Sequence, residues 1–135
     1  LALTRATPEQ IEEAQDYLAG SRQVRPPTPV RELVALDEAF HLRIAAMAHN
    51  AELLRLLENL NQRIRFVRWL AMESVGREST QEQHQQLLDA LAAGQAEEAE
   101  RCLSQHIGLR REQVVEAIGR GLARIYMPQE DAAQP

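Results

Sequence analysis

Four side chains in this sequence have the types and spacing of metal ligands. Asp37 and His41 stand four residues apart within residues 33–57, where apolar residues recur every three or four positions. That period is typical of an amphipathic helix, in which residues four apart share a face. A carboxylate and an imidazole are therefore directed at or beside the core, where a polar group without a partner is costly. Either they satisfy each other and nearby backbone groups, or they share a metal ion.

Two further histidines are expected at one height in the fold. His84 and His106 each share a helical face with apolar residues, and Gly94 favours a tight turn between the two helices. His84 stands ten residues before Gly94 and His106 twelve after it, so in a helical hairpin the imidazoles would be nearly level. Together with Asp37 and His41 they would form a four-ligand mononuclear site.

Spacing alone leaves a second interpretation open, because a histidine on an apolar face is often a hydrogen-bonded core residue. His49 falls outside the pattern and is expected at the surface. Cys102, four residues before His106, is either a softer ligand or, more ordinarily, a buried inert thiol. The sequence contains no Gly-rich phosphate loop, nucleophile elbow or His-Glu-x-x-His motif.

Five helices are expected to position these residues. Thr7 and Gln10 form a capping box that opens the first helix, and Gly20 is expected to end it. Ser79 and Glu82 suggest another capping box at the start of the fourth helix. The expected helices cover residues 6–19, 29–50, 51–74, 80–92 and 96–118 or beyond.

Composition supports an all-α fold. Of the 135 residues, 44% are hydrophobic and only 4% aromatic, and the abundant Ala, Leu, Glu, Gln and Arg favour helices over strands. We predict an antiparallel helical bundle with short connections over residues 1–127, and a disordered polar tail over residues 128–135.

Charge and hydropathy limit the possible partners. The formal net charge of −5 argues against a nucleic-acid surface on this chain, and no apolar run approaches the roughly 18 residues of a membrane span. The single Cys102 excludes an internal disulfide and fits a reducing cytoplasm. Because the chain opens at Leu1, almost inside a helix signal, we expect it to be a fragment.

The same residues follow the pattern of a known family. The matching elements are Asp37-x-x-Phe40-His41, Ala48-x-Asn50-x-x-Leu53, Glu82-x-His84, Ala90-x-x-x-Gly94, Ala99 and His106. In order and spacing they resemble the effector-binding FCD domain, the C-terminal half of FadR/VanR-type regulators in the GntR family. The resemblance covers nearly the whole chain, from Ala6 to about His106.

The resemblance implies a specific site. Asp37, His41, His84 and His106 would bind a divalent metal ion whose open positions take the carboxylate of a small organic-acid effector. Zinc is the first expectation, with nickel or manganese as alternatives. Arg63, beside the apolar stripe of the third helix, is the candidate effector ligand; the alternative is a solvated arginine.

The resemblance also implies a homodimer that contacts DNA through an N-terminal winged helix-turn-helix. That module, and the first helix of the domain with its effector-binding arginine, are expected upstream of this chain. The function expected is therefore ligand sensing in a cytoplasmic transcriptional regulator, not catalysis. Two alternatives are a mononuclear metalloenzyme acting on organic acids, with Glu82 as general base, and a structural bundle without a ligand.

Overall fold

The computed structural model describes residues 5–25, 27–75 and 77–126. Within these ranges the chain forms five α-helices and no strand, which confirms the predicted all-α bundle. The helices are α1 (Pro8–Arg22), α2 (Val30–Ala46), α3 (Ala51–Val75), α4 (Glu78–Ala92) and α5 (Ala96–Tyr126). The predicted tail over residues 128–135 lies outside the described residues.

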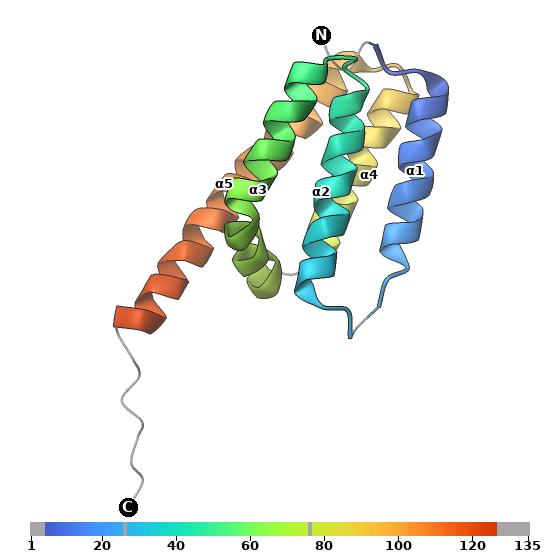
Figure 1. Ribbon diagram of the computed structural model, residues 1–135. Helices are drawn as coiled ribbons and strands as arrows, with labels where there is room; N and C mark the ends of the chain where they lie inside the picture. The colour runs from blue at the N-terminus through green and yellow to red at the C-terminus, as the bar shows by residue number, and fades with distance from the viewer. Residues whose placement is uncertain (1–4, 26, 76, 127–135) are drawn as a thin grey trace, which may run out of the picture.

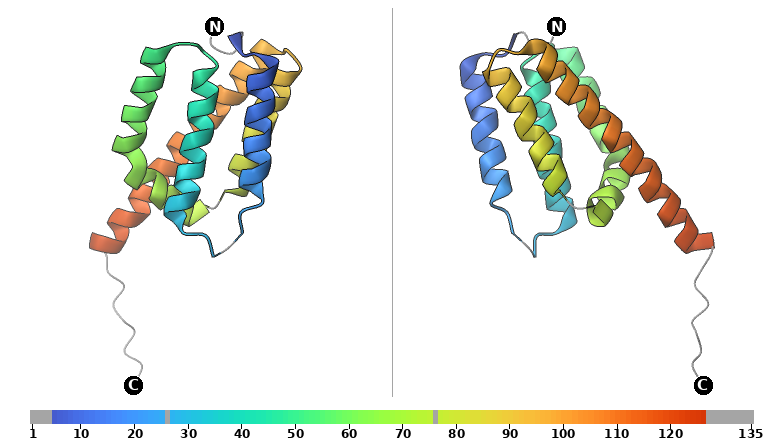
Figure 2. Two further views of the ribbon diagram at one scale, coloured as in Figure 1. Left: turned by 45° about the vertical axis from the view of Figure 1, so that its right-hand side comes forward. Right: turned by 180° about the vertical axis from the view of Figure 1, so that it is seen from behind.

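Successive helices alternate in direction, as short connections favour. Helix α2 packs against α1 and α3, α4 packs against α1 and α5, and α5 also packs against α3. The C-terminal part of α5 extends past the other helices (Figures 1 and 2). The end of the bundle nearest the α1–α2 connection also holds the start of α4 (Figure 1).

The core lies mainly between α1, α2, α4 and α5. Its buried members are Ala14, Leu18, Phe40, Ile44, Met47, Leu87, Leu88, Ala90, Leu91, Ala99 and Cys102. Helix α3 is less covered than its apolar period predicted, because Leu53 and Leu60 are 39% and 49% exposed. Its buried apolar side chains Ala71 and Met72 lie near its C-terminal end.

Three predicted helix boundaries were wrong. Helix α2 ends at Ala46 and not at residue 50, and His49, not Asn50, adopts the left-handed conformation. Gly20 does not end α1, which continues to Arg22 with Ser21 buried; a helix tolerates one interior glycine when packing holds the next residue in place. Helix α4 begins at Glu78 without a side-chain cap, so the Ser79–Glu82 capping box does not form. Instead, the Glu78 carboxylate accepts a hydrogen bond from the Arg77 backbone N–H, 3.2 Å away.

Local hydrogen bonds and backbone conformation account for the start of α1 and for the α2–α3 connection. The Thr7–Gln10 capping box is present at the start of α1. His49 adopts a left-handed φ of 50° after α2, and Asn50 caps α3 by accepting a hydrogen bond from the Leu53 N–H at 3.1 Å. His49 is exposed, as expected.

Candidate metal centre

Helix α2 turns Asp37 and His41 toward the other helices. Asp37 is 4% exposed, and the His41 side chain is 14% exposed. Their side chains lie on one face, with 3.6 Å between Asp37 Oδ2 and His41 Nδ1. This confirms that the four-residue spacing places both groups at the interior of the bundle.

Three histidines from three helices meet at this point. One ring nitrogen each of His41 on α2, His84 on α4 and His106 on α5 lies within 4.8 Å of the other two. His84 and His106 are 1% and 4% exposed, and their ring centroids are 4.8 Å apart. The prediction that these two imidazoles lie level across the α4–α5 hairpin is therefore confirmed.

Hydrogen bonds fix how two of these rings are oriented. His41 Nδ1 lies 2.8 Å from the backbone oxygen of Asp37, and His106 Nδ1 lies 2.8 Å from Gln83 Oε1. Both oxygens can only accept, so each Nδ1 carries a hydrogen, and in the neutral form of each ring Nε2 is the nitrogen that can bind a metal ion. This is the arrangement in which histidines bind metals through Nε2.

The two Nε2 atoms face each other. His41 Nε2 and His106 Nε2 are 2.9 Å apart, so their lone pairs repel unless a proton or another cation lies between them. Two tetrahedral ligands of one zinc ion lie about 3.3 Å apart, because each metal–nitrogen bond is about 2.0–2.1 Å. The residues therefore fit a metal ion. Phe40 supports the third ring by stacking on His84, with 3.9 Å between centroids.

Asp37 supplies the negative charge of the cluster. Its Oδ1 lies 3.8 Å from His84 Nε2, and its Oδ2 accepts a hydrogen bond from Arg68 Nη1 at 3.2 Å. The structure thus brings all four predicted ligands together. It also adds Arg68 on α3, whose side chain is 20% exposed and which sequence reasoning did not select. A buried carboxylate needs a compensating charge, and an arginine on a neighbouring helix is one expected partner.

The other candidates lie elsewhere. Arg63 is exposed on α3, so its role as an effector ligand stays a prediction. Glu38, which was not a candidate, is 5% exposed and forms a two-point ion pair with Arg65, at 3.2 and 2.7 Å. Glu82 is exposed and lines a pocket at the end of the bundle.

Burial, with a smaller effect from Glu98, raises the pKa of the Cys102 thiol. This is consistent with Cys102 being an inert core residue.

Comparison with known proteins gives the family. The sequence profile of the FCD domain matches residues 1–109. The chain is also 31% identical over 132 residues to a protein of Aminobacter aminovorans described as "Nta operon transcriptional regulator"; the match covers 98% of this chain and 61% of that relative. No solved structure matches the chain.

The chain belongs to the FCD domain family, the effector-sensing domain of GntR-type transcriptional regulators, as its residue pattern predicted. It spans about three-fifths of the length of the curated relative it matches. Family membership points to a regulator and away from the metalloenzyme alternative. Among the described residues, no helix is both long enough and apolar enough to cross a membrane.

Proposed function

We propose that this chain binds one divalent metal ion through Asp37, His41, His84 and His106, and a small organic acid beside it. The observation that carries the proposal is the pair of opposed Nε2 atoms of His41 and His106, 2.9 Å apart. Both Nδ1 atoms face oxygen acceptors, so each ring directs its Nε2 at the point where a cation would be bound.

The four ligand side chains determine which metal ions the site can bind. Three imidazoles and a carboxylate suit zinc, nickel or manganese. A divalent cation held there would offset the charge of Asp37 and offer open positions to a carboxylate oxygen. The chain's own residues orient the ligands: Gln83 holds His106, the Asp37 backbone holds His41, and Phe40 holds His84.

The position of the site suggests how binding is transmitted. Its side chains come from α2, α4 and α5, so ligand binding stabilises one relative placement of these three helices. A ligand shifts such an equilibrium only by its difference in affinity for the two states. In a homodimer, the shift would alter the placement of two N-terminal winged helix-turn-helix modules and so modulate DNA binding.

A melting experiment tests the link between metal and acid. The zinc-loaded chain is melted with citrate, malate, succinate, lactate or gluconate, each with and without chelator. A ligand that binds only the folded state adds about 2.7 kcal/mol at a hundredfold excess over its dissociation constant, which raises the melting temperature by roughly 5 °C or more. We expect that rise for at least one acid, and only when zinc is present.

Two results would contradict the proposal. Equal shifts with and without chelator would mean that the acid binds away from the histidines, for example at surface arginines. No shift with any acid in the zinc-loaded protein would favour a structural bundle whose histidines are core residues.

A further inference from the structure

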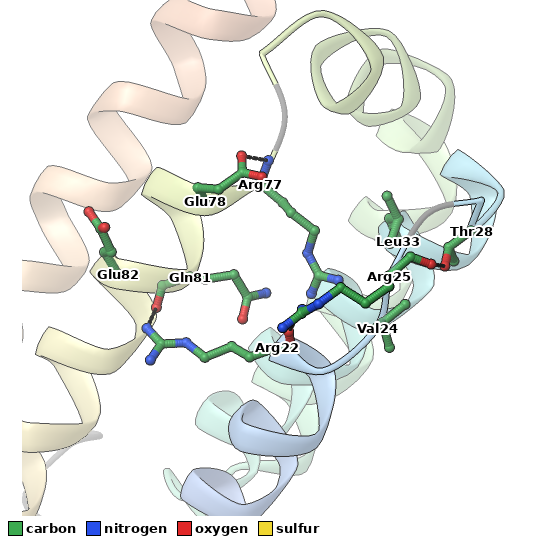
Figure 3. A pocket seen from close by; sticks show the side chains of 9 residues that line it. All are labelled: Arg22, Val24, Arg25, Thr28, Leu33, Arg77, Glu78, Gln81 and Glu82. Atoms are coloured by element: carbon green, nitrogen blue, oxygen red, sulfur yellow. Dashed lines mark hydrogen bonds between the residues drawn. The ribbon is translucent and has the colours of Figure 1, made fainter.

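A pocket of about 620 Å³ opens between the end of α1, the start of α2 and the start of α4. Three arginines and two glutamates contribute to its lining, so positive groups outnumber negative ones. Its lining residues are Arg22, Val24, Arg25, Thr28, Leu33, Arg77, Glu78, Gln81 and Glu82. Figure 3 shows the Arg77 side chain reaching from the start of α4 into this space, with the Gln81 side chain beside it.

Arg77 has one hydrogen-bonding group to spare. Its Nη2 donates to Ser21 Oγ at 2.6 Å, but its Nη1 is buried and meets no acceptor among the described residues. Burial lowers the pKa of the Arg77 guanidinium, and the charges of Asp37, Glu78 and Tyr17 act in the opposite direction. An arginine stays charged, and a buried charged donor without an acceptor is costly. An anionic oxygen would relieve that cost.

Gln81 has a second unsatisfied group in the same pocket. The residue is 8% exposed, and its Oε1 is buried without a donor among the residues that the structure describes. Its backbone oxygen, by contrast, accepts from Arg22 Nη2 at 2.7 Å. With a buried spare donor and a buried spare acceptor, the pocket suits a polar group and not an apolar one. The Arg77 donor is the group that favours an anion, because the Gln81 oxygen can only accept.

The pocket adjoins the candidate metal centre along the bundle. Leu33 and Gln81 line the pocket, and they precede Asp37 and His84 by four and three residues on the same helices. Such spacing is one helical turn, about 5.4 Å along the axis.

We propose that this pocket binds a second acid group of the effector, so that the domain selects di- or tricarboxylates over monocarboxylates. The inference rests on the proposed function, because the first acid group is bound at the metal. Arg77 is the specificity-determining residue: its Nη1 would donate to the distal carboxylate. Arg22 and Arg25, both exposed, would add only positive charge around the opening.

Calorimetric titration of the zinc-loaded chain with succinate and with butyrate tests the inference. The two acids have equal carbon chains and differ by one carboxylate. We expect succinate to bind roughly tenfold or more tightly, the difference expected of one charge-assisted hydrogen bond. Arg77→Gln should bring the two affinities to within about twofold, while zinc content and butyrate binding stay unchanged.

Matched variants separate this contact from general effects. Arg25→Gln removes an exposed arginine of the same pocket and should keep the preference for succinate. Ser21→Ala removes the other hydrogen bond of Arg77 and should also keep it. Arg77→Lys retains the charge without the second donor arm, so it should keep part of the preference and serves if Arg77→Gln does not fold.

The outcomes distinguish this inference from the proposed function. Equal binding of both acids by the unchanged chain, or a preference that survives Arg77→Gln, overturns the second subsite and leaves the metal site standing. If Arg25→Gln abolishes the preference as fully as Arg77→Gln, the effect is one of overall charge and the inference is also wrong. Failure to retain zinc or bind either acid contradicts the proposed function itself.

Discussion

His41 on α2 and His106 on α5 point their Nε2 atoms at each other across 2.9 Å. Each ring uses its Nδ1 to donate to an oxygen, the Asp37 carbonyl for His41 and Gln83 Oε1 for His106. The two rings are thus held so that both Nε2 atoms face one point, beside the buried His84 and Asp37. At this distance the two rings can share a proton or bind a common cation.

The first prediction concerns metal content. Purified chain reloaded with zinc should carry one ion, and the double variant His84→Ala plus His106→Ala should lose it, because two of three nitrogen donors are gone. Elemental analysis after removal of free metal measures this directly. His49→Ala is the matched control, since His49 is exposed and outside the cluster. Unchanged loading of the double variant would contradict the assignment.

The second prediction concerns two glycines in opposite conformations. Gly94 has a φ of 68°, which strains any residue with a Cβ, so Gly94→Ala should destabilise the fold by about 1 kcal/mol. Gly20 lies inside α1, and nothing lies within 4 Å of an added Cβ there; Gly20→Ala should therefore stabilise by about 0.5–1 kcal/mol. Urea unfolding gives both values. A stabilised Gly94→Ala would show that this turn does not require a left-handed residue.

Much of this arrangement follows from short-range rules. The apolar period and the Thr7 cap predicted the helices, and the distances from Gly94 predicted that His84 and His106 lie level, because a hairpin pairs residues equidistant from its turn. The choice between Arg63 and Arg68 depends instead on how α3 lies against α2. That register is set by packing between helices, which the period of a single helix does not encode. For the same reason, the period of α3 did not reveal that Leu60 is 49% exposed.

The third prediction uses the buried thiol of Cys102, which is 8% exposed. Burial, the largest effect, raises its pKa, and the Glu98 charge adds to this. Alkylation of Cys102 in the folded chain should therefore be slow. Its rate should still rise about tenfold per pH unit at pH values where the alkylation rate of an ordinary thiol no longer changes. Because the unfolded thiol loses its proton first, stability should fall as the pH rises above that ordinary pKa. Rapid alkylation with an ordinary pH profile would contradict this.

The fourth prediction is that this chain alone does not bind DNA sequence-specifically. It carries 15 basic and 20 acidic residues, and DNA affinity depends on basic groups that displace counterions. Several of its arginines are already paired with carboxylates: Arg55 with Glu52, Arg65 with Glu38, Arg68 with Asp37, Arg101 with Glu98 and Arg120 with Glu116. Fluorescence anisotropy with operator DNA at physiological salt decides it. Tight, sequence-selective binding would overturn the prediction.

The last prediction concerns the pair formed by Arg68 and Asp37. Arg68 Nη1 is 3.2 Å from Asp37 Oδ2, and the two side chains are 20% and 5% exposed. Arg68→Gln leaves a buried carboxylate without its arginine, which should destabilise the zinc-free chain by about 2–3 kcal/mol, somewhat less than for a fully buried pair. Zinc bound by Asp37 would supply the missing positive charge. The rise in melting temperature on adding zinc should therefore be larger in Arg68→Gln than in the unchanged chain.

Arg65→Gln is the control for that comparison. It also removes an ion pair between α3 and α2, at 2.7 Å, with a carboxylate that is 7% exposed, and Glu38 is the residue next to Asp37. Because Glu38 is not a predicted ligand, Arg65→Gln should lower the melting temperature equally with and without zinc. If Arg68→Gln behaves in the same way as Arg65→Gln, Asp37 does not bind the metal, and the site consists of the three histidines without it.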